Sequence, residues 1–165
     1  MVKFLIGPFL SSPTSVVMPV VNQAKVLNIN ESAFPNAGNA KSFPYTFARE
    51  TPSTLIAQLF ANFIKANGWK RVGVIAVNNA LGQTLVPALQ QVIPPTGATI
   101  TKVELVPAGT PDVTPQMSTI KGTNPDVVIM GLTDDPGMTA VIKAKIQLSM
   151  TSPRLGYSSS ANPGT

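Results

Sequence analysis

Two short runs that are apolar after a charged first residue limit what this chain can fold into. One is RVGVIAV at 71–77 and the other is DVVIMG at 126–131. A strand that faces solvent on one side alternates apolar and polar residues, whereas a strand of a parallel sheet covered by helices on both faces is apolar throughout. Both runs are therefore predicted to be strands of a parallel α/β sheet.

Helical patterns separate these runs from further predicted strands. Strands are also predicted over 4–6, 26–29, 99–106 and 154–157, and helices over 12–24, 52–67, 81–93, 114–123 and 136–149. Residues 35–46 are rich in Pro, Gly and Asn, which predicts a loop. Strands that alternate with helices indicate βα units with right-handed crossovers, so the fold class is α/β with Rossmann-like parallel sheets and flanking helices.

Helical spacing also predicts which residues share a helix face. In the helix over 12–24 the predicted apolar stripe is Val16, Val17, Val20 and Val21. In the helix over 52–67 it is Leu55, Leu59, Phe60, Phe63 and Ile64. The strands fall into two groups, so we expect parts of two lobes: 1–50 in the first, 51–69 as a helix leading toward the second, and 70–165 in the second.

The chain has little material for catalysis. Of its 165 residues none is Cys or His, which excludes thiol nucleophiles, imidazole bases and the common zinc sites. The Asp134-Asp135 pair follows a predicted strand, but before Pro136-Gly137 it is more typical of a helix cap than of a metal site. No Walker or dinucleotide glycine motif is present. We therefore expect no enzyme activity, no cofactor and no metal.

Charge argues against nucleic-acid binding, and hydropathy argues against a membrane-spanning segment. The net charge is +5, but the basic residues are scattered and only Lys70 and Arg71 are adjacent, so no nucleic-acid stripe forms. No apolar run approaches the roughly 18 residues of a membrane span. Residues 1–10 lack the charged start and cleavage site of a signal peptide, so an export signal is expected to lie outside this sequence.

Hydroxyl side chains gather where the predicted strands end. Ligands of parallel α/β sheets bind at the carboxyl ends of the strands, here the loops 7–12, 30–34, 78–82, 131–135 and 157–160. The hydroxyl residues at or just after these ends are Ser11, Ser12, Ser32, Thr133, Tyr157, Ser158 and Ser159. With backbone N–H groups at a helix start, such neutral donors suit a carboxylate. Ser12 before Pro13 also fits a helix cap, and this alternative stays open.

Three stretches carry a resemblance to a known family. FLIGPFLSSPTSVVMPVVNQAKV (4–26) joins a strand through Ile-Gly and Ser-Ser to a helix. FPYTFARETPSTLIAQLFANFIKANGWKRVGVIAVNNALGQTLVPALQ (43–90) is similar to a segment that crosses into a second lobe. VPAGTPDVTPQMSTIKGTNPDVVIMG (106–131) holds an Ala-Gly-x-x-Asp turn, a helix and then Asn-x-Asp. In this order they resemble the type I periplasmic binding proteins, and most closely the branched-chain amino acid (leucine/isoleucine/valine) group of ABC transporters.

The resemblance implies a function and a site. Proteins of this family close two lobes over a small ligand outside the cytoplasm and deliver it to a membrane permease. On this likeness Ser11 and Ser12 bind the ligand carboxylate. The remaining predicted contacts are Ser32, Ala33 and Phe34 in the first lobe, and Leu81, Thr133, Tyr157 and Ser158 in the second.

Departures from the family pattern bear on the ligand. Phe34 stands where the family often has Thr, and Leu81 where it often has Tyr. Ser158 falls near the Glu that pairs with the ammonium of amino-acid ligands. An ammonium in a closed cleft needs an acidic partner, so an aromatic or keto acid is favoured over a branched-chain amino acid unless Asp134 or Asp135 substitutes.

Two other functions stay open beside solute binding. The same fold serves ligand-sensing receptors and regulators, and a flavodoxin-like enzyme domain is a third possibility that the missing phosphate loop disfavours. Family members are also substantially longer, and the likeness places this chain from the third strand of the first lobe to partway through the second. Unpaired strand edges and uncovered apolar faces are then expected to favour self-association.

Overall fold

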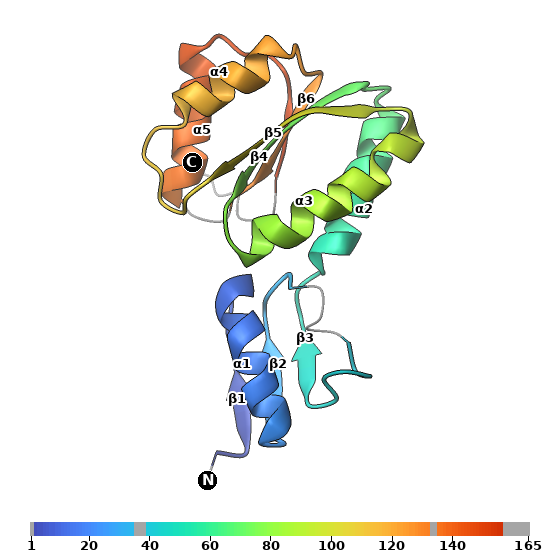
Figure 1. The fold of residues 1–165 in the computed structure, drawn as a ribbon, viewed down its shortest axis with the longest axis vertical. Helices are drawn as coiled ribbons and strands as arrows, with labels where there is room; N and C mark the ends of the chain where they lie inside the picture. Colours follow the sequence, from blue (N-terminus) through green and yellow to red (C-terminus); the bar gives the residue numbers. More distant parts are fainter. Residues whose placement is uncertain (1, 35–38, 133–134, 157–165) are drawn as a thin grey trace.

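The computed structural model describes residues 2–34, 39–132 and 135–156, and it contains two parallel sheets (Figure 1). The elements of the first part are β1 (Phe4–Ile6), α1 (Ser11–Gln23), β2 (Leu27–Asn30), β3 (Thr46–Ala48) and α2 (Ser53–Ala66). Those of the second part are β4 (Arg71–Val77), α3 (Ala80–Val92), the 3-10 helix η2 (Pro94–Thr96), β5 (Thr99–Val106), α4 (Thr114–Gly122), β6 (Val127–Gly131), α5 (Asp135–Gln147) and β7 (Arg154–Gly156).

The larger sheet has four parallel strands in the order β5-β4-β6-β7. The helices α2 and α3 lie on one face and α4 and α5 on the other (Figure 1). With both faces covered, β6 is buried along its whole length and β4 from Val72 onward. The interpretation of the two apolar runs as strands of a parallel sheet is therefore confirmed.

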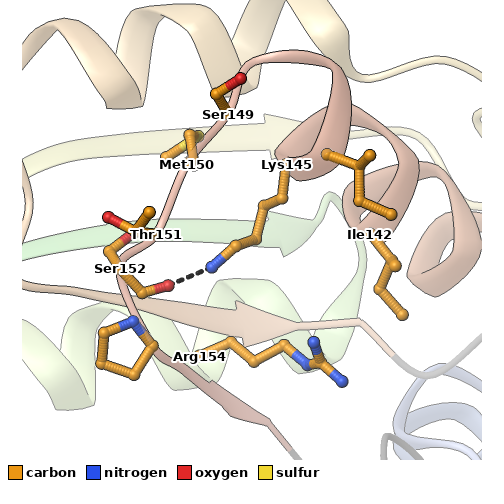
Figure 2. Close-up of a pocket in the computed structure, with 9 residues that line it drawn as sticks. Ile142, Lys145, Ser149, Met150, Thr151, Ser152 and Arg154 are labelled. Carbon is orange, nitrogen blue, oxygen red and sulfur yellow. Dashed lines mark hydrogen bonds between the residues drawn. The ribbon is translucent and has the colours of Figure 1, made fainter.

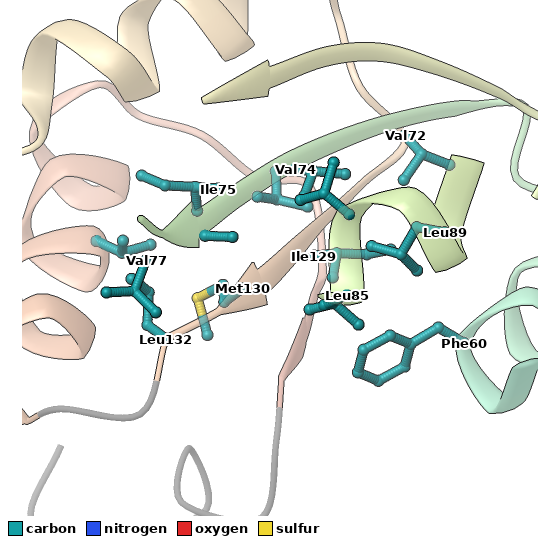
Figure 3. Close-up of a cluster of buried hydrophobic side chains, with 14 of the residues drawn as sticks. Phe60, Val72, Val74, Ile75, Val77, Leu85, Leu89, Ile129, Met130 and Leu132 are labelled. Atoms are coloured by element: carbon teal, nitrogen blue, oxygen red, sulfur yellow. The ribbon is translucent and has the colours of Figure 1, made fainter. Parts of the chain in front are cut away.

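One hydrophobic core surrounds this larger sheet (Figure 3). The core includes Val74 of β4 and Ile129 of β6. Three helix residues belong to the same core: Leu85 and Leu89 of α3 and Phe60 of α2. Helix α2 belongs to this core, since Ala57, Ala61 and Ile64 are fully buried in it. Gly131 of β6 allows close packing of α3, because a Cβ there would lie 2.8 Å from Leu85 Cδ2 and 2.9 Å from Ala76 Cβ.

The smaller sheet has three parallel strands in the order β1-β2-β3, and α1 lies over one face (Figure 1). Along β2 the side chains of Asn28 and Asn30 are buried, and Asn28 donates to the carbonyls of Leu5 and Gly7. The other face carries exposed apolar side chains, namely Phe4, Ile6, Leu27, Ile29 and Phe47. No described residues cover this apolar sheet face.

The structure corrects three sequence predictions in this region. The strand β3 was not predicted, because Thr46–Ala48 follows a Pro- and Gly-rich loop and pairs with β2 through tertiary contacts. The stripe predicted for α1 is right only at Val21: Val16 and Val20 are exposed, and the other buried residues of the helix are Ser11, Thr14 and Met18. The stripe predicted for α2 is right at two of its five residues: Phe60 and Ile64 are buried, whereas Leu55, Leu59 and Phe63 are exposed.

Candidate functional site

The first predicted site residues lie in the opening turn of α1. The helix begins at Ser11, and its N-cap is Leu10, which makes no side-chain capping bond. Ser12 is therefore inside the helix, and the prediction that it caps the helix start is wrong. The Thr14 hydroxyl instead donates to the Leu10 carbonyl at 2.8 Å, so the local hydrogen bonds of this turn do not use Ser12 Oγ.

Ser12 makes a bond to a distant part of the chain. Its Oγ accepts a hydrogen bond from the backbone N–H of Ala80 at 3.4 Å. Ala80 is the first residue of α3, and Asn79 caps that helix by accepting from the N–H groups of Leu81 at 2.9 Å and Gly82 at 3.4 Å. The Ser12 bond thus joins the first turn of α1 to the first turn of α3.

Two helix N-termini meet at this bond. Each N-terminus carries unsatisfied N–H groups and the positive end of a helix dipole, roughly half a unit charge. Two positive ends close together disfavour one another and favour an anion between them. Because Ser12 Oγ accepts from Ala80, its own proton stays available to donate to such an anion.

Ser11 lies beside Ser12 with its side chain largely enclosed, at 7% exposed. Within the described residues its hydroxyl makes no hydrogen bond. The Ser11 Oγ atom is not among the fully buried side-chain atoms that lack a partner, so it keeps some contact with solvent. A hydroxyl in this state can donate its proton to water or to a ligand oxygen.

The neighbouring loop after β2 is held by its own hydrogen bonds. The N–H and the hydroxyl of Ser32 both donate to Asn30 Oδ1 at 3.2 Å. The N–H of Glu31 donates to the Pro8 carbonyl at 3.1 Å, which ties this loop to the loop before α1. Since the Ser32 proton is committed to Asn30, its oxygen offers acceptor lone pairs and suits a ligand hydroxyl or ammonium better than a carboxylate.

The remaining predicted ligand contacts do not all lie near Ser12. The Ala33 carbonyl accepts from the N–H of Ser53 at 2.8 Å, and Phe34 is half-buried. Leu81 is 4% exposed and belongs to the hydrophobic core. Thr133, Tyr157 and Ser158 lie outside the described residues. The structure therefore brings Ser11 and Ser12 to the start of α3, with Ser32 in an adjoining loop.

Sequence reasoning missed two residues of this site, Asn79 and Ala80. Asn79 carries a recognisable signal, because Asn before a helix start is a preferred cap. Ala80 contributes only its backbone N–H, so no side-chain pattern points to it. The carboxylate nearest in sequence, Glu31, is neutralised by an ion pair with Arg49 at 2.9 Å.

The groups that this candidate site offers are neutral hydrogen-bond donors. Among the described residues no group of three or more Asp or Glu side chains is placed to hold a metal ion. None of the helices in the described ranges has both the length and the apolarity that crossing a bilayer requires. A cavity of about 510 Å³ lies elsewhere, between α5 and the loop before β7.

Comparisons with known proteins agree on the fold. A family model described as periplasmic binding protein matches residues 1–154. A periplasmic binding protein type 1 from Bordetella pertussis Tohama I is similar in structure, with a TM-score of 0.85 and 22% identity, over 96% of this chain and 44% of that one. An extracellular ligand-binding receptor from Rhodopseudomonas palustris HaA2 gives 0.84 and 21%, over 93% and 43%. No curated protein sequence matches the chain.

Other similar structures were solved with ligands. A solute binding protein of an ABC transporter from R. palustris, in complex with 4-hydroxybenzoate, has a TM-score of 0.83 and 19% identity over 96% of this chain and 44% of that one. Another from R. palustris, in complex with benzoate, gives 0.82 and 16% over 93% and 43%. The chain thus spans less than half the length of each of these relatives, and at these identities the likeness concerns the fold.

Proposed function

This chain belongs to the type I periplasmic binding protein family, and from that membership we propose that it is part of a solute-binding component of an ABC transporter. The ligand is a small carboxylate. Its partner is a permease in the membrane, and its location is outside the cytoplasm. The ligand-binding arrangement at Ser11, Ser12 and the start of α3 supports this function.

One observation carries the proposal. Ser12 Oγ meets the Ala80 N–H where two helix N-termini converge, and the hydroxyl of the neighbouring Ser11 makes no hydrogen bond within the described residues. A carboxylate placed there accepts from both hydroxyls and lies in the field of both helix ends. We propose that this is the carboxylate position of the ligand.

The ligand class follows from the charges near the site. The described carboxylate closest in sequence, Glu31, is already paired with Arg49. An α-ammonium in a closed cleft needs a free acidic partner, so an aromatic or keto acid suits these residues better than an amino acid. Similar solved proteins bound to 4-hydroxybenzoate and benzoate make aromatic acids the first ligands to test.

Calorimetric titration of this chain with benzoate, 4-hydroxybenzoate and leucine tests the proposal. We expect saturable binding of an aromatic acid that weakens at least tenfold in Ser11→Ala and in Ser12→Ala. Thr119→Ala is the matched control, since Thr119 is exposed on α4 and its hydroxyl bonds only within that helix. Saturable binding of leucine alone would overturn the ligand class, and no saturable binding of any of the three would overturn the function.

A further inference from the structure

A cavity of about 510 Å³ lies between the end of α5 and the loop that leads into β7 (Figure 2). The residues that line it are Ile142, Lys145, Ile146, Ser149, Met150, Thr151, Ser152, Pro153 and Arg154. The loop precedes β7, so this basic cavity is at the amino ends of the parallel strands. The Ser12 site is at the opposite, carboxyl ends, and the two are separate.

Lys145 gives the basic cavity a buried charge. Its residue is only 9% exposed, and its Nζ donates to the Ser152 carbonyl (Figure 2). An ammonium has three donors, and this bond uses one. Among the described residues no carboxylate forms an ion pair with it. Buried charges are normally paired, because an unpaired one is costly.

The nearest influence on Lys145 has the same sign. Arg154 at the start of β7 lines the same cavity, and together with burial it holds the pKa of Lys145 below its usual range, burial being the larger cause. Lys121 adds a third cation on the far side of the 149–152 loop, where it donates to the Leu148 carbonyl at 2.7 Å and lines a second hollow of about 210 Å³. Three cations therefore lie beside this loop.

Hydroxyl groups complete the donor set. The Ser152 Oγ atom is buried and makes no hydrogen bond within the described part of the chain. Ser149 and Thr151 also line the cavity. Two cations, an unpaired buried hydroxyl and further hydroxyls are the groups that bind a carboxylate or phosphate in proteins.

We propose that this basic cavity binds a small oxyanion, held by Lys145 and Arg154 and by the hydroxyl of Ser152. The anion neutralises the repulsion between the two cations and supplies the partner that Lys145 lacks. Phosphate and carboxylate groups share this chemistry, and inorganic phosphate and acetate distinguish them as probes. The proposal is independent of the Ser12 site.

Thermal unfolding and ³¹P NMR of this chain in increasing phosphate, at ionic strength held constant with sodium chloride, test the proposal. We expect a saturable rise in Tm and broadening of the phosphate signal. Lys145→Met reduces the apparent affinity at least tenfold, and it raises Tm without phosphate because it removes an unpaired buried charge. Arg154→Gln, at an exposed position, reduces the affinity without affecting folding, and Lys143→Met on the exposed side of α5 is the control.

The outcomes separate clearly. The proposal is overturned if phosphate raises Tm no more than chloride does. It is also overturned if the response to phosphate is unchanged in both Lys145→Met and Arg154→Gln, since Lys145 then only donates to the Ser152 carbonyl. A stronger response to acetate than to phosphate assigns the cavity to carboxylates. Aromatic-acid binding at the Ser12 site is expected to persist in Lys145→Met, so failure here leaves the proposed function standing.

Discussion

Gly82 in the first turn of α3 lies against the last residue of β4, and a Cβ built on it would be 1.9 Å from the carbonyl oxygen of Val77. Glycine is the residue that permits this approach of helix to strand. It brings the start of α3, with the Ala80 N–H, directly to the carboxyl end of the sheet. The position of the Ala80 N–H, which donates to Ser12, therefore depends on residue 82 being a glycine.

Gly82→Ala is expected to destabilise the chain strongly. The obstacle is backbone, which cannot rotate away, so α3 must shift, at a cost of about 3 kcal/mol, the upper end for overpacking. Urea unfolding measures the loss. Gly122→Ala at the end of α4 is the control, since a Cβ at that position would have no neighbour within 4 Å and alanine favours a helix by about 1 kcal/mol. Equal effects of the two substitutions would contradict the argument.

A hydroxyl pair joins α2 to α3. Ser53 Oγ donates to Thr84 Oγ1 at 3.1 Å, and Ser53 is fully buried. Thr84→Val leaves the Ser53 hydroxyl without its acceptor and is expected to lower the free energy of unfolding by about 2 kcal/mol, whereas Ser53→Ala lowers it by about 1 kcal/mol. Thr119→Val on the exposed face of α4 is expected to change it by less than about 0.5 kcal/mol. A smaller loss in Thr84→Val than in Ser53→Ala would count against this account.

Asp126 links the starts of two strands. Its Oδ2 accepts from the N–H groups of Lys70 at 2.6 Å and Arg71 at 2.9 Å, and the bond from Lys70 is the main cause that lowers its pKa. Since the folded pKa lies below the unfolded one, the stabilisation is present above about pH 4 and disappears as the pH falls through the folded value.

The difference in unfolding free energy between the unsubstituted chain and Asp126→Asn measures this contribution. We expect the unsubstituted chain to be more stable at pH 7 and the difference to shrink on acidification from about pH 4 downward. A difference that stays constant down to about pH 2 would show that ionisation of Asp126 contributes nothing to stability and would contradict this account.

The uncovered apolar sheet face is expected to make the chain self-associate. It carries Ile29 at 41% and Phe47 at 54% exposed, and exposed apolar patches favour association. The double substitution Ile29→Glu and Phe47→Glu should lower the concentration-dependent mass in sedimentation velocity. Val16→Glu, exposed on α1, should leave it unchanged. A monomer at all concentrations before substitution would rule the expectation out.

Sequence reasoning succeeded where local pattern and burial agree. The apolar runs of β4 and β6 predicted both strands, because a strand covered on two faces is apolar at nearly every position. It largely failed in α1, where the small polar residues Ser11 and Thr14 are buried and Val16 and Val20 are exposed, the reverse of what hydropathy predicts. β3 was missed since three residues acquire strand geometry only through pairing with β2.

The candidate site was predictable only where its residues follow a local sequence pattern. Strand-end position identified Ser11 and Ser12, but the Ser12 bond reaches Ala80 across 68 residues and depends on a backbone group. Leu81 shows the opposite case, a predicted contact whose side chain the structure places in the core. The division into 1–50, 51–69 and 70–165 and the ligand contacts themselves remain predictions.

The meeting of two helix N-termini at Ser12 and Ala80 bears on the charge of the ligand. The two ends carry partial charges of like sign, and the bond from the Ala80 N–H to Ser12 Oγ at 3.4 Å holds them close together. An anion placed between the two ends is attracted by both of them. On the proposed function, a neutral ester of the same acid is therefore expected to bind more weakly than the acid.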